Sequence, residues 1–370
     1  MILSFSAAVH TGIDRPLQVQ TVQLTEAPPD GEVLVEMAAS GLCFSDLHVM
    51  RGDWPSPTPL VLGHEGAGVV RAVGRGVRTL TEGDHVVLNW TPSCGSCRFC
   101  VGGRPALCDL AKTTASRHVM PDGTTRLSRD GRPVHSYLAL GTFGQFAMVQ
   151  ERAAIAVRRD VPLAQASLVG CAVTTGIGAV VNTAGVEPGA GVVVIGCGGV
   201  GLNVVQGARL AAAHPIVAVD PQASKQEAAR RFGATHTLNA SGAELAEAVA
   251  ELTGGRGIDY SFEAVGTPGT TEDAIRCIGK GGTAVLVGQV AMGQTIRIDP
   301  LTVSDQEKVI RGCNYGSARP AIDFPRLLDL YMHGRIDLDS LITDRVGLPD
   351  INAGFEAMRS RSSIRTVVEL

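Results

Sequence analysis

The segment VVVIGCGGVGLN, residues 192–203, constrains the fold more than any other part of this sequence. A run of four β-branched residues is followed by Gly196, Gly198 and Gly201, and the residues after them are typical of a helix. Glycines at this spacing between a strand and a helix let the backbone approach a pyrophosphate at the helix N-terminus. About 20 residues further on, the next expected strand, PIVAVD, ends at Asp220, whose carboxylate can bind an adenosine ribose and repel a 2′-phosphate. The pattern predicts a dinucleotide site that prefers NAD to NADP.

The length of the chain and its apolar patterns predict how it divides into domains. At 370 residues it is longer than one hydrophobic core usually supports, so we expect two domains. Residues 17–90 hold short alternating apolar segments that favour antiparallel strands, whereas from about Ala172 strand, turn and helix alternate, as in a doubly wound parallel sheet. Residues 111–136 are polar and rich in turn residues, which indicates a long surface loop, and two helices and a closing strand are expected after residue 312. The expected domains of this α/β chain are 1–172, 173–312 and 313–370, the last completing the first.

Four of the nine cysteines lie close together, in the segment PSCGSCRFCVGGRPALC. Cys94, Cys97, Cys100 and Cys108 have the spacing C-x2-C-x2-C-x7-C, which lets four thiolates enclose one tetrahedral zinc ion with no open position. Such a site stabilises a loop and does not catalyse a reaction. An iron–sulfur cluster is the alternative, although its fourth cysteine usually follows at a different spacing, and four free thiols are a further one.

A second candidate metal set is spread over distant segments. Cys43, His64 and Cys171 are the ligand types of a catalytic zinc ion that keeps one open position. Taken singly, each is more readily explained as a buried free cysteine or a hydrogen-bonded core histidine. The polar residues next to these candidates in the sequence are Ser45, Asp46, His48 and Glu65.

Charge and composition exclude several classes of partner. The net charge of −4 and the absence of a long basic cluster argue against nucleic acid. The N-terminus, MILSFSAAVHTG, has no basic region followed by an apolar run, and no stretch is expected to approach the roughly 18 apolar residues of a membrane span. An odd number of cysteines in a long chain favours metal or catalytic use over disulfides. We therefore expect a cytoplasmic protein without membrane or nucleic-acid partners.

In combination, these segments resemble the zinc-dependent medium-chain alcohol dehydrogenases, in the branch with the liver-type, glutathione-linked formaldehyde and aryl-alcohol enzymes. The resemblance runs from about residue 7 to Leu370 and rests on GHEGAG, the four-cysteine lobe, MPDGTTRL, the glycine fingerprint and the closing SIRT. It implies a GroES-like, mostly antiparallel β catalytic domain with a zinc lobe at 92–110, and a Rossmann domain for NAD.

The resemblance also implies roles for individual residues. Cys43, His64 and Cys171 correspond to the catalytic zinc ligands, and the four lobe cysteines to a structural zinc site. Ser45 and His48 correspond to a proton relay through the cofactor ribose, Asp46 to the residue that orients the ligand histidine, and Glu65 to a carboxylate near the metal. The residues that correspond to cofactor contacts are Gly196, Gly198, Gly199, Val200, Gly201, Asp220, Lys225, Thr175 and Arg365. Trp54 and Trp90 correspond to walls of the substrate pocket.

Three positions depart from the family's pattern. Phe44 stands where liver-type and formaldehyde enzymes usually carry Arg or His against the cofactor pyrophosphate. Trp54 stands where glutathione-linked enzymes have an acidic residue, with Asp53 adjacent, and Lys112 where they have an arginine that anchors the thiol adduct. These departures weaken the expectation of a glutathione adduct.

The sequence therefore predicts an NAD-dependent zinc alcohol dehydrogenase. The expected reaction is the reversible oxidation of a primary, aromatic or allylic alcohol to the aldehyde, by hydride transfer from a zinc-bound alkoxide. The alternative is a formaldehyde dehydrogenase that acts on an S-hydroxymethyl thiol adduct. A zinc-bound structural or regulatory protein is a third hypothesis, against which the intact ligand and fingerprint sets argue. The resemblance also implies a homodimer that pairs edge strands, here around Ile296 to Ile298.

Overall fold

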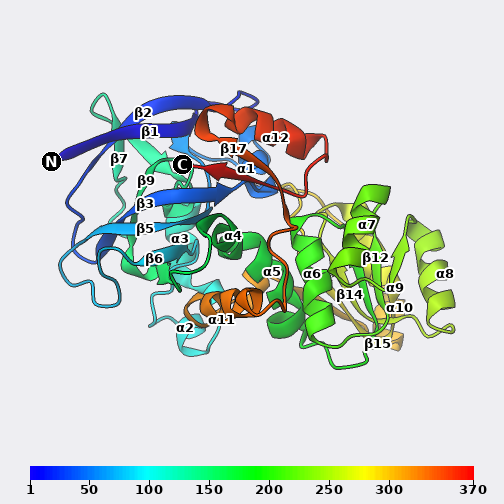
Figure 1. The fold of residues 1–370 in the computed structure, drawn as a ribbon. Helices are drawn as coiled ribbons and strands as arrows, with labels where there is room; N and C mark the ends of the chain where they lie inside the picture. The colour runs from blue at the N-terminus through cyan, green and yellow to red at the C-terminus, as the bar shows by residue number, and fades with distance from the viewer. The chain divides into compact units, whose positions relative to one another are not determined.

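The computed structural model describes residues 1–370, and the chain forms two compact units (Figure 1). The first unit comprises Met1–Cys171 and Arg319–Leu370, and the second comprises Ala172–Ala318. The nucleotide-type segment is thus inserted into a unit that both ends of the chain complete.

The first unit contains two β-sheets, most of whose strand pairs are antiparallel. A small closed barrel has the strand order β1 (Ile2–His10), β2 (Gln18–Thr25), β7 (Leu127–Arg129), β8 (Arg132–Ser136) and β4 (Leu60–Val61). A seven-stranded sheet has the order β10 (Ala154–Ala156), β6 (His85–Leu88), β5 (Glu65–Val73), β3 (Glu32–Gly41), β18 (Arg365–Glu369) and β17 (Ile342–Gly347), with β9 (Phe146–Gln150) paired to β3. This is the predicted mostly antiparallel β domain.

The helices of the first unit are short. They are α1 (Phe44–Arg51), α2 (Arg98–Val101), α3 (Asp109–Arg117), α4 (Leu163–Leu168), α11 (Pro320–Met332), α12 (Ile351–Arg359), and the 3-10 turns η1 (Pro105–Leu107), η2 (Tyr137–Ala139), η3 (Glu151–Ala153) and η7 (Leu348–Asp350). A π-helical turn, η4 (Val169–Val173), follows α4. The apolar side of α1 is buried in a core cluster in which Leu47 and Met50 lie with Phe143 and Phe355. This packing fixes the helix that carries Ser45 and His48.

The second unit is a doubly wound parallel sheet, as predicted. Its strand order is β13 (His236–Leu238), β12 (Ile216–Val219), β11 (Val192–Ile195), β14 (Ile258–Glu263), β15 (Ile278–Leu286) and β16 (Val309–Gly312). Its helices are α5 (Thr174–Gly178), η5 (Ala179–Ala184), α6 (Gly199–Leu210), α7 (Ala223–Phe232), α8 (Gly242–Leu252), α9 (Pro268–Cys277), α10 (Pro300–Asp305) and η6 (Tyr315–Ser317). β11 is a central strand of this sheet, with Val192 opposite Ile216 in β12 and Tyr260 in β14. All four of its residues are buried because α6 and α9 pack against it.

The prediction of a long loop over residues 111–136 is wrong. Most of α3 lies in this segment, followed by the hairpin of β7 and β8. Asp130 and Gly131 both have positive φ angles (51° and 72°), the conformation of a tight hairpin turn. The Asp-Gly pair is a hairpin signal that outweighs the polar composition of the segment.

One helical stretch corrects the expectation about apolar length. Leu163–Ala184 has 22 residues and contains an 18-residue window with a mean hydropathy of 1.6, which meets the length and composition of a membrane span. However, 83% of that 18-residue window is buried within the protein. A core helix passes the same test, so this stretch is weak evidence for a membrane segment.

Candidate functional site

Three side chains able to bind one metal ion meet in the first unit. Cys43 directly precedes α1, His64 directly precedes β5, and Cys171 lies in η4. All three are buried, and their sulfur and ring nitrogen atoms lie within 4.8 Å of one another. Two thiolates and one imidazole at this spacing fit a tetrahedral zinc ion with one open position, the arrangement of catalytic zinc sites.

Asp46 links two of these ligand segments. Its Oδ1 lies 3.4 Å from Nδ1 of His64 and accepts a hydrogen bond from the Gly63 N–H (3.1 Å), while Oδ2 accepts one from the Cys43 N–H (3.2 Å). The carboxylate is fully buried. Because Nδ1 of His64 faces Asp46, its Nε2 is left for a metal ion, which is how carboxylates orient ligand histidines in zinc sites.

The electrostatics of this cluster suit a cation. The Cys171 thiol donates to Cys43, and His64 and Arg365 add positive charge, so the pKa of Cys43 lies well below its ordinary value despite burial. Burial opposes protonation of His64, but Asp46 and Cys43 outweigh it and raise the pKa of His64 to about 10. The surroundings of His64 therefore favour positive charge, which a bound metal ion would supply in place of the proton.

A buried ion pair lies next to the cluster. Arg365, the first residue of β18, pairs with Glu65, the first residue of β5, and the two side chains are 6% and 0% exposed. Burial lowers the pKa of Arg365, while the negative charges of Cys43 and Asp46 act in the opposite direction. The guanidinium thus compensates the carboxylates and thiolates around the candidate metal site. Its expected contact with the cofactor stays a prediction.

The two expected relay residues lie on α1, Ser45 in its first turn and His48 in its last. The Oγ of Ser45 is 3.6 Å from the Sγ of Cys43. Nδ1 of His48 is 2.8 Å from Oδ2 of Asp53, and the His48 ring stacks on Trp54 with centroids 4.5 Å apart and an interplanar angle of 23°. Ser45 is therefore beside the candidate metal site, and His48 is held by two residues from beyond the end of the helix.

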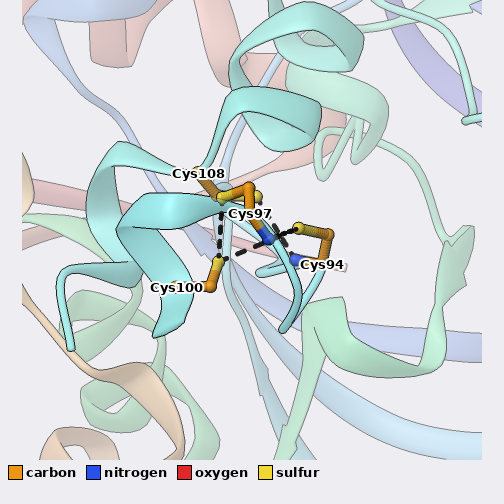
Figure 2. Close-up of side chains that lie close together, drawn as sticks. All are labelled: Cys94, Cys97, Cys100 and Cys108. Atoms are coloured by element: carbon orange, nitrogen blue, oxygen red, sulfur yellow. Dashed lines mark hydrogen bonds between the residues drawn. The ribbon is translucent and has the colours of Figure 1, made fainter. Parts of the chain in front are cut away.

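The four lobe cysteines converge on a second centre (Figure 2). Their sulfurs lie within 4.8 Å of one another, with 3.5 Å from Cys97 to Cys100 and 4.0 Å from Cys94 to Cys100. Sulfurs on one tetrahedral zinc ion are about 3.8 Å apart, given Zn–S bonds of about 2.3 Å. The Cys94 N–H donates to Cys108 Sγ (3.2 Å) and the Cys97 N–H to Cys94 Sγ (3.3 Å). Backbone N–H groups of Ser96 and Cys97 help lower the pKa of Cys94 to about 6, so this thiol is readily available as a thiolate ligand. The spacing fits a closed single-ion site.

The glycine turn of the second unit has the shape that a dinucleotide site requires. The turn joins β11 to α6, and a Cβ added at Gly201 would lie 1.7 Å from the carbonyl oxygen of Gly196. Only glycine fits there. Asp220, at the end of β12, accepts hydrogen bonds from the N–H groups of Cys197 (2.9 Å) and Gln222 (2.9 Å). The carboxylate thus lies directly against the turn.

Other predicted cofactor residues lie near the same turn within this unit. Thr175 is the one residue of α5 that is not buried, and Val200 in the first turn of α6 is also partly exposed. Lys225 in α7 is close enough for its charge to act on Cys197, whose thiol pKa burial raises to about 12. Gly198 and Gly199 begin α6.

The predicted pocket residues and the departures lie in separate surroundings. Trp54 and Trp90 are partly buried and pack against different core clusters. Phe44 is 49% exposed at the first position of α1, and Lys112 is exposed on α3. Their expected place in the walls of the substrate pocket stays a prediction.

Sequence reasoning missed two residues of the site. Asp53 was noted only as a neighbour of Trp54, although the end of α1 turns it back onto His48. Tyr137, whose ring meets His64 edge-on with centroids 5.5 Å apart, lies just after the segment read as a loop. Its place is set by the barrel, which no local pattern reveals.

A glycine turn on a parallel sheet and an open two-thiolate, one-imidazole cluster in one chain define a metal- and dinucleotide-dependent oxidoreductase. Residues 29–159 match the alcohol dehydrogenase GroES-like domain, and residues 199–332 match the zinc-binding dehydrogenase family. The chain belongs to the zinc-dependent alcohol dehydrogenases, an NAD-dependent family of enzymes.

Relatives match along nearly the whole chain. The chain is 41% identical to the S-(hydroxymethyl)glutathione dehydrogenase of Paracoccus denitrificans over 371 aligned positions, with 98% of each chain covered. It is 41% identical to the NDMA-dependent alcohol dehydrogenase of Amycolatopsis methanolica, again with 98% of each covered. The crystal structure of benzyl alcohol dehydrogenase from Acinetobacter calcoaceticus superposes with a TM-score of 0.94 at 30% identity, covering 100% of this chain and 99% of that one.

Proposed function

We propose that this dehydrogenase oxidises an S-hydroxymethyl thiol, the adduct of formaldehyde with a small thiol, using NAD. The observation that carries the proposal is the open cluster of Cys43, His64 and Cys171, within 4.8 Å of one another, in a chain 41% identical end to end to an S-(hydroxymethyl)glutathione dehydrogenase. The relatives thus support the alternative more than the aromatic or allylic alcohol expected from the sequence.

The chain's own residues have distinct tasks in this reaction. When bound, zinc supplies a Lewis acid that lowers the pKa of a hydroxyl group, and NAD accepts the hydride. Cys43, His64 and Cys171 hold the metal, and Asp46 fixes the tautomer of His64. Ser45 relays the proton that the hydroxyl group releases, and His48 accepts it. Arg365 balances the negative charge of Glu65 and of the thiolates.

The identity of the thiol stays open in this proposal. Where glutathione-linked enzymes have an acidic residue, this chain has Trp54, so it lacks that carboxylate as a partner for the amino group of glutathione. Where those enzymes have an arginine, this chain has Lys112, which also places a cation on the exposed side of α3. A thiol that carries a carboxylate but needs no acidic partner would fit both changes. Lys112→Met should then raise KM for the adduct with little change for a simple alcohol.

The test compares NADH formation from formaldehyde with and without added thiols. Glutathione and N-acetylcysteine would be the two probes, the second because it lacks a free amino group. We expect turnover that requires a thiol. Formaldehyde turnover that ignores added thiols, or none with either probe, would refute the thiol-adduct proposal.

A second candidate substrate is an aromatic primary alcohol. Trp54 presents a large aromatic surface stacked on His48, and the benzyl alcohol dehydrogenase of Acinetobacter calcoaceticus has the same fold along the whole chain. Benzyl and cinnamyl alcohol belong in the same assay. Turnover of these alcohols without any thiol would favour this candidate.

A further inference from the structure

A carboxylate and an indole hold the imidazole of His48 from two sides. Oδ2 of Asp53 lies 2.8 Å from Nδ1 of His48, and the Trp54 ring stacks on the His48 ring at 4.5 Å. The side chains of His48 and Asp53 are 21% and 31% exposed. The pair is therefore ordered by two contacts and still reaches water.

The end of α1 produces this arrangement. Gly52 ends the helix in the left-handed conformation (φ 78°), and its N–H donates to the Val49 carbonyl (3.0 Å). The Trp54 N–H donates to the carbonyl of His48 itself (3.4 Å). The chain therefore folds back over the last turn of α1, and this brings Asp53 and Trp54 onto His48.

We propose that Asp53 is a positioning residue for His48. A carboxylate at Nδ1 requires the N–H of the neutral ring to be on that nitrogen, so Nε2 carries the lone pair that accepts a proton. The hydroxyl group of the substrate loses its proton as its carbon loses the hydride to NAD. That proton reaches Nε2, the imidazolium keeps Nδ1–H on Asp53, and water next to the exposed edge of the pair takes the proton away. This inference rests on the proposed function, because it assigns His48 to proton removal.

An ordinary surface ion pair would have no such effect. Exposed pairs of this kind add little to stability and nothing to a proton transfer. The two hypotheses differ in one respect: a positioning residue acts only through His48, so its loss has no consequence once His48 is gone.

The kinetic test uses Asp53→Ala, Asp53→Glu, His48→Gln and the double variant of His48→Gln with Asp53→Ala. The quantity is kcat/KM for the best alcohol, which is independent of product release. We expect Asp53→Ala to lower it by about tenfold, a part of the 10²–10⁴-fold of a general base, and Asp53→Glu to restore most of the loss. In the His48→Gln background, Asp53→Ala should cause no further loss. The matched control is Asp30→Asn, which removes an exposed carboxylate paired with Arg75 and should leave the rate unchanged.

A second measurement does not depend on turnover. In protein labelled with ¹⁵N-histidine, the His48 signal, assigned by its loss in His48→Gln, should show the Nδ1–H tautomer in the parent and a mixture in Asp53→Ala. A parental rate in Asp53→Ala, an equal loss with and without His48, or an unchanged tautomer would each overturn the inference. If the parent oxidises no alcohol or adduct, the proposed function fails, while the tautomer still decides whether Asp53 positions His48.

Discussion

At the scale of single residues, the candidate catalytic metal site consists of three donors from distant segments, so we expect the loss of one donor to weaken metal binding. Cys43→Ser replaces a thiolate of strongly lowered pKa by a neutral hydroxyl group. We expect turnover to fall by at least about 100-fold, because the hydroxyl group of the substrate is then no longer acidified. NADH binding, measured by fluorescence titration, should persist, because Cys43 lies outside the unit with the glycine turn. Cys277→Ser, which changes a buried thiol outside both groups of candidate metal ligands, is the control. Near-normal rates in Cys43→Ser would show that the catalytic assignment is wrong.

We expect Asp220 to select between the two nicotinamide cofactors. Its carboxylate is held against the glycine turn by the N–H groups of Cys197 and Gln222, so a 2′-phosphate would meet a fixed negative charge. We expect a preference for NAD of tenfold or more in kcat/KM, about 1.4 kcal/mol, and Asp220→Ala should narrow it. The exposed Asp305 in the same unit gives the control variant Asp305→Ala. Equal use of NAD and NADP by the parent would contradict the assignment.

A substitution of Trp90 tests whether the enzyme prefers aromatic alcohols. It is partly buried against the core cluster that contains Leu88 and Leu140. An aromatic contact adds roughly 0.5–1.5 kcal/mol beyond burial, so Trp90→Ala should lower the ratio of benzyl alcohol to ethanol kcat/KM by roughly tenfold. Cofactor affinity should stay the same. An unchanged ratio would assign Trp90 to packing.

At the scale of elements, the four-cysteine lobe is a closed centre that holds a segment with little regular structure. Only the short α2 and η1 lie between Cys97 and Cys108. Cys97→Ser should lower the midpoint of thermal unfolding and reduce the zinc content from two ions per chain to one. The kcat of the folded variant should stay close to that of the parent. Elemental analysis with differential scanning calorimetry measures both quantities. Iron with a visible absorbance, or a single zinc ion in the parent, would refute the two-site assignment.

The sequence predicted those elements whose pattern is local. The run at β11, the glycine turn and α6 follow from residues in direct succession, and the closing strand β18 follows from SIRTVVEL. Strand β17 was missed because four of its six residues, Ile342–Gly347, are exposed or polar and give no alternating pattern. The β7–β8 hairpin was missed because polar composition was given more weight than its Asp-Gly turn.

At the scale of the whole molecule, the candidate catalytic site could not be derived from spacing alone. Cys43, His64 and Cys171 belong to a helix start, a strand start and a π-helical turn, and only the packing of β3, β5 and α4 brings these segments together. The resemblance supplied what local patterns lack. The four lobe cysteines are the opposite case, because cysteines three to eight positions apart within one short segment can meet in almost any fold.

The exposed edge of the six-stranded sheet is a candidate surface for assembly with another copy, because apolar side chains lie around it. Strand β16 ends the six-stranded sheet, and Met292, Leu301 and Val309 are 73%, 73% and 46% exposed. Residues 296–298, where strand pairing was expected, lie outside any strand here, in the segment before α10. An apolar sheet edge of this kind favours pairing with another copy.

We therefore expect a homodimer in sedimentation equilibrium. Leu301→Glu should shift it towards monomer, because a carboxylate would be buried without a partner in the interface. Ile13→Glu, a 63% exposed apolar residue of the other unit, should leave the dimer intact. A monomeric parent would contradict the expected dimer. A dimer that persists in Leu301→Glu but dissociates in Ile13→Glu would place the interface in the other unit.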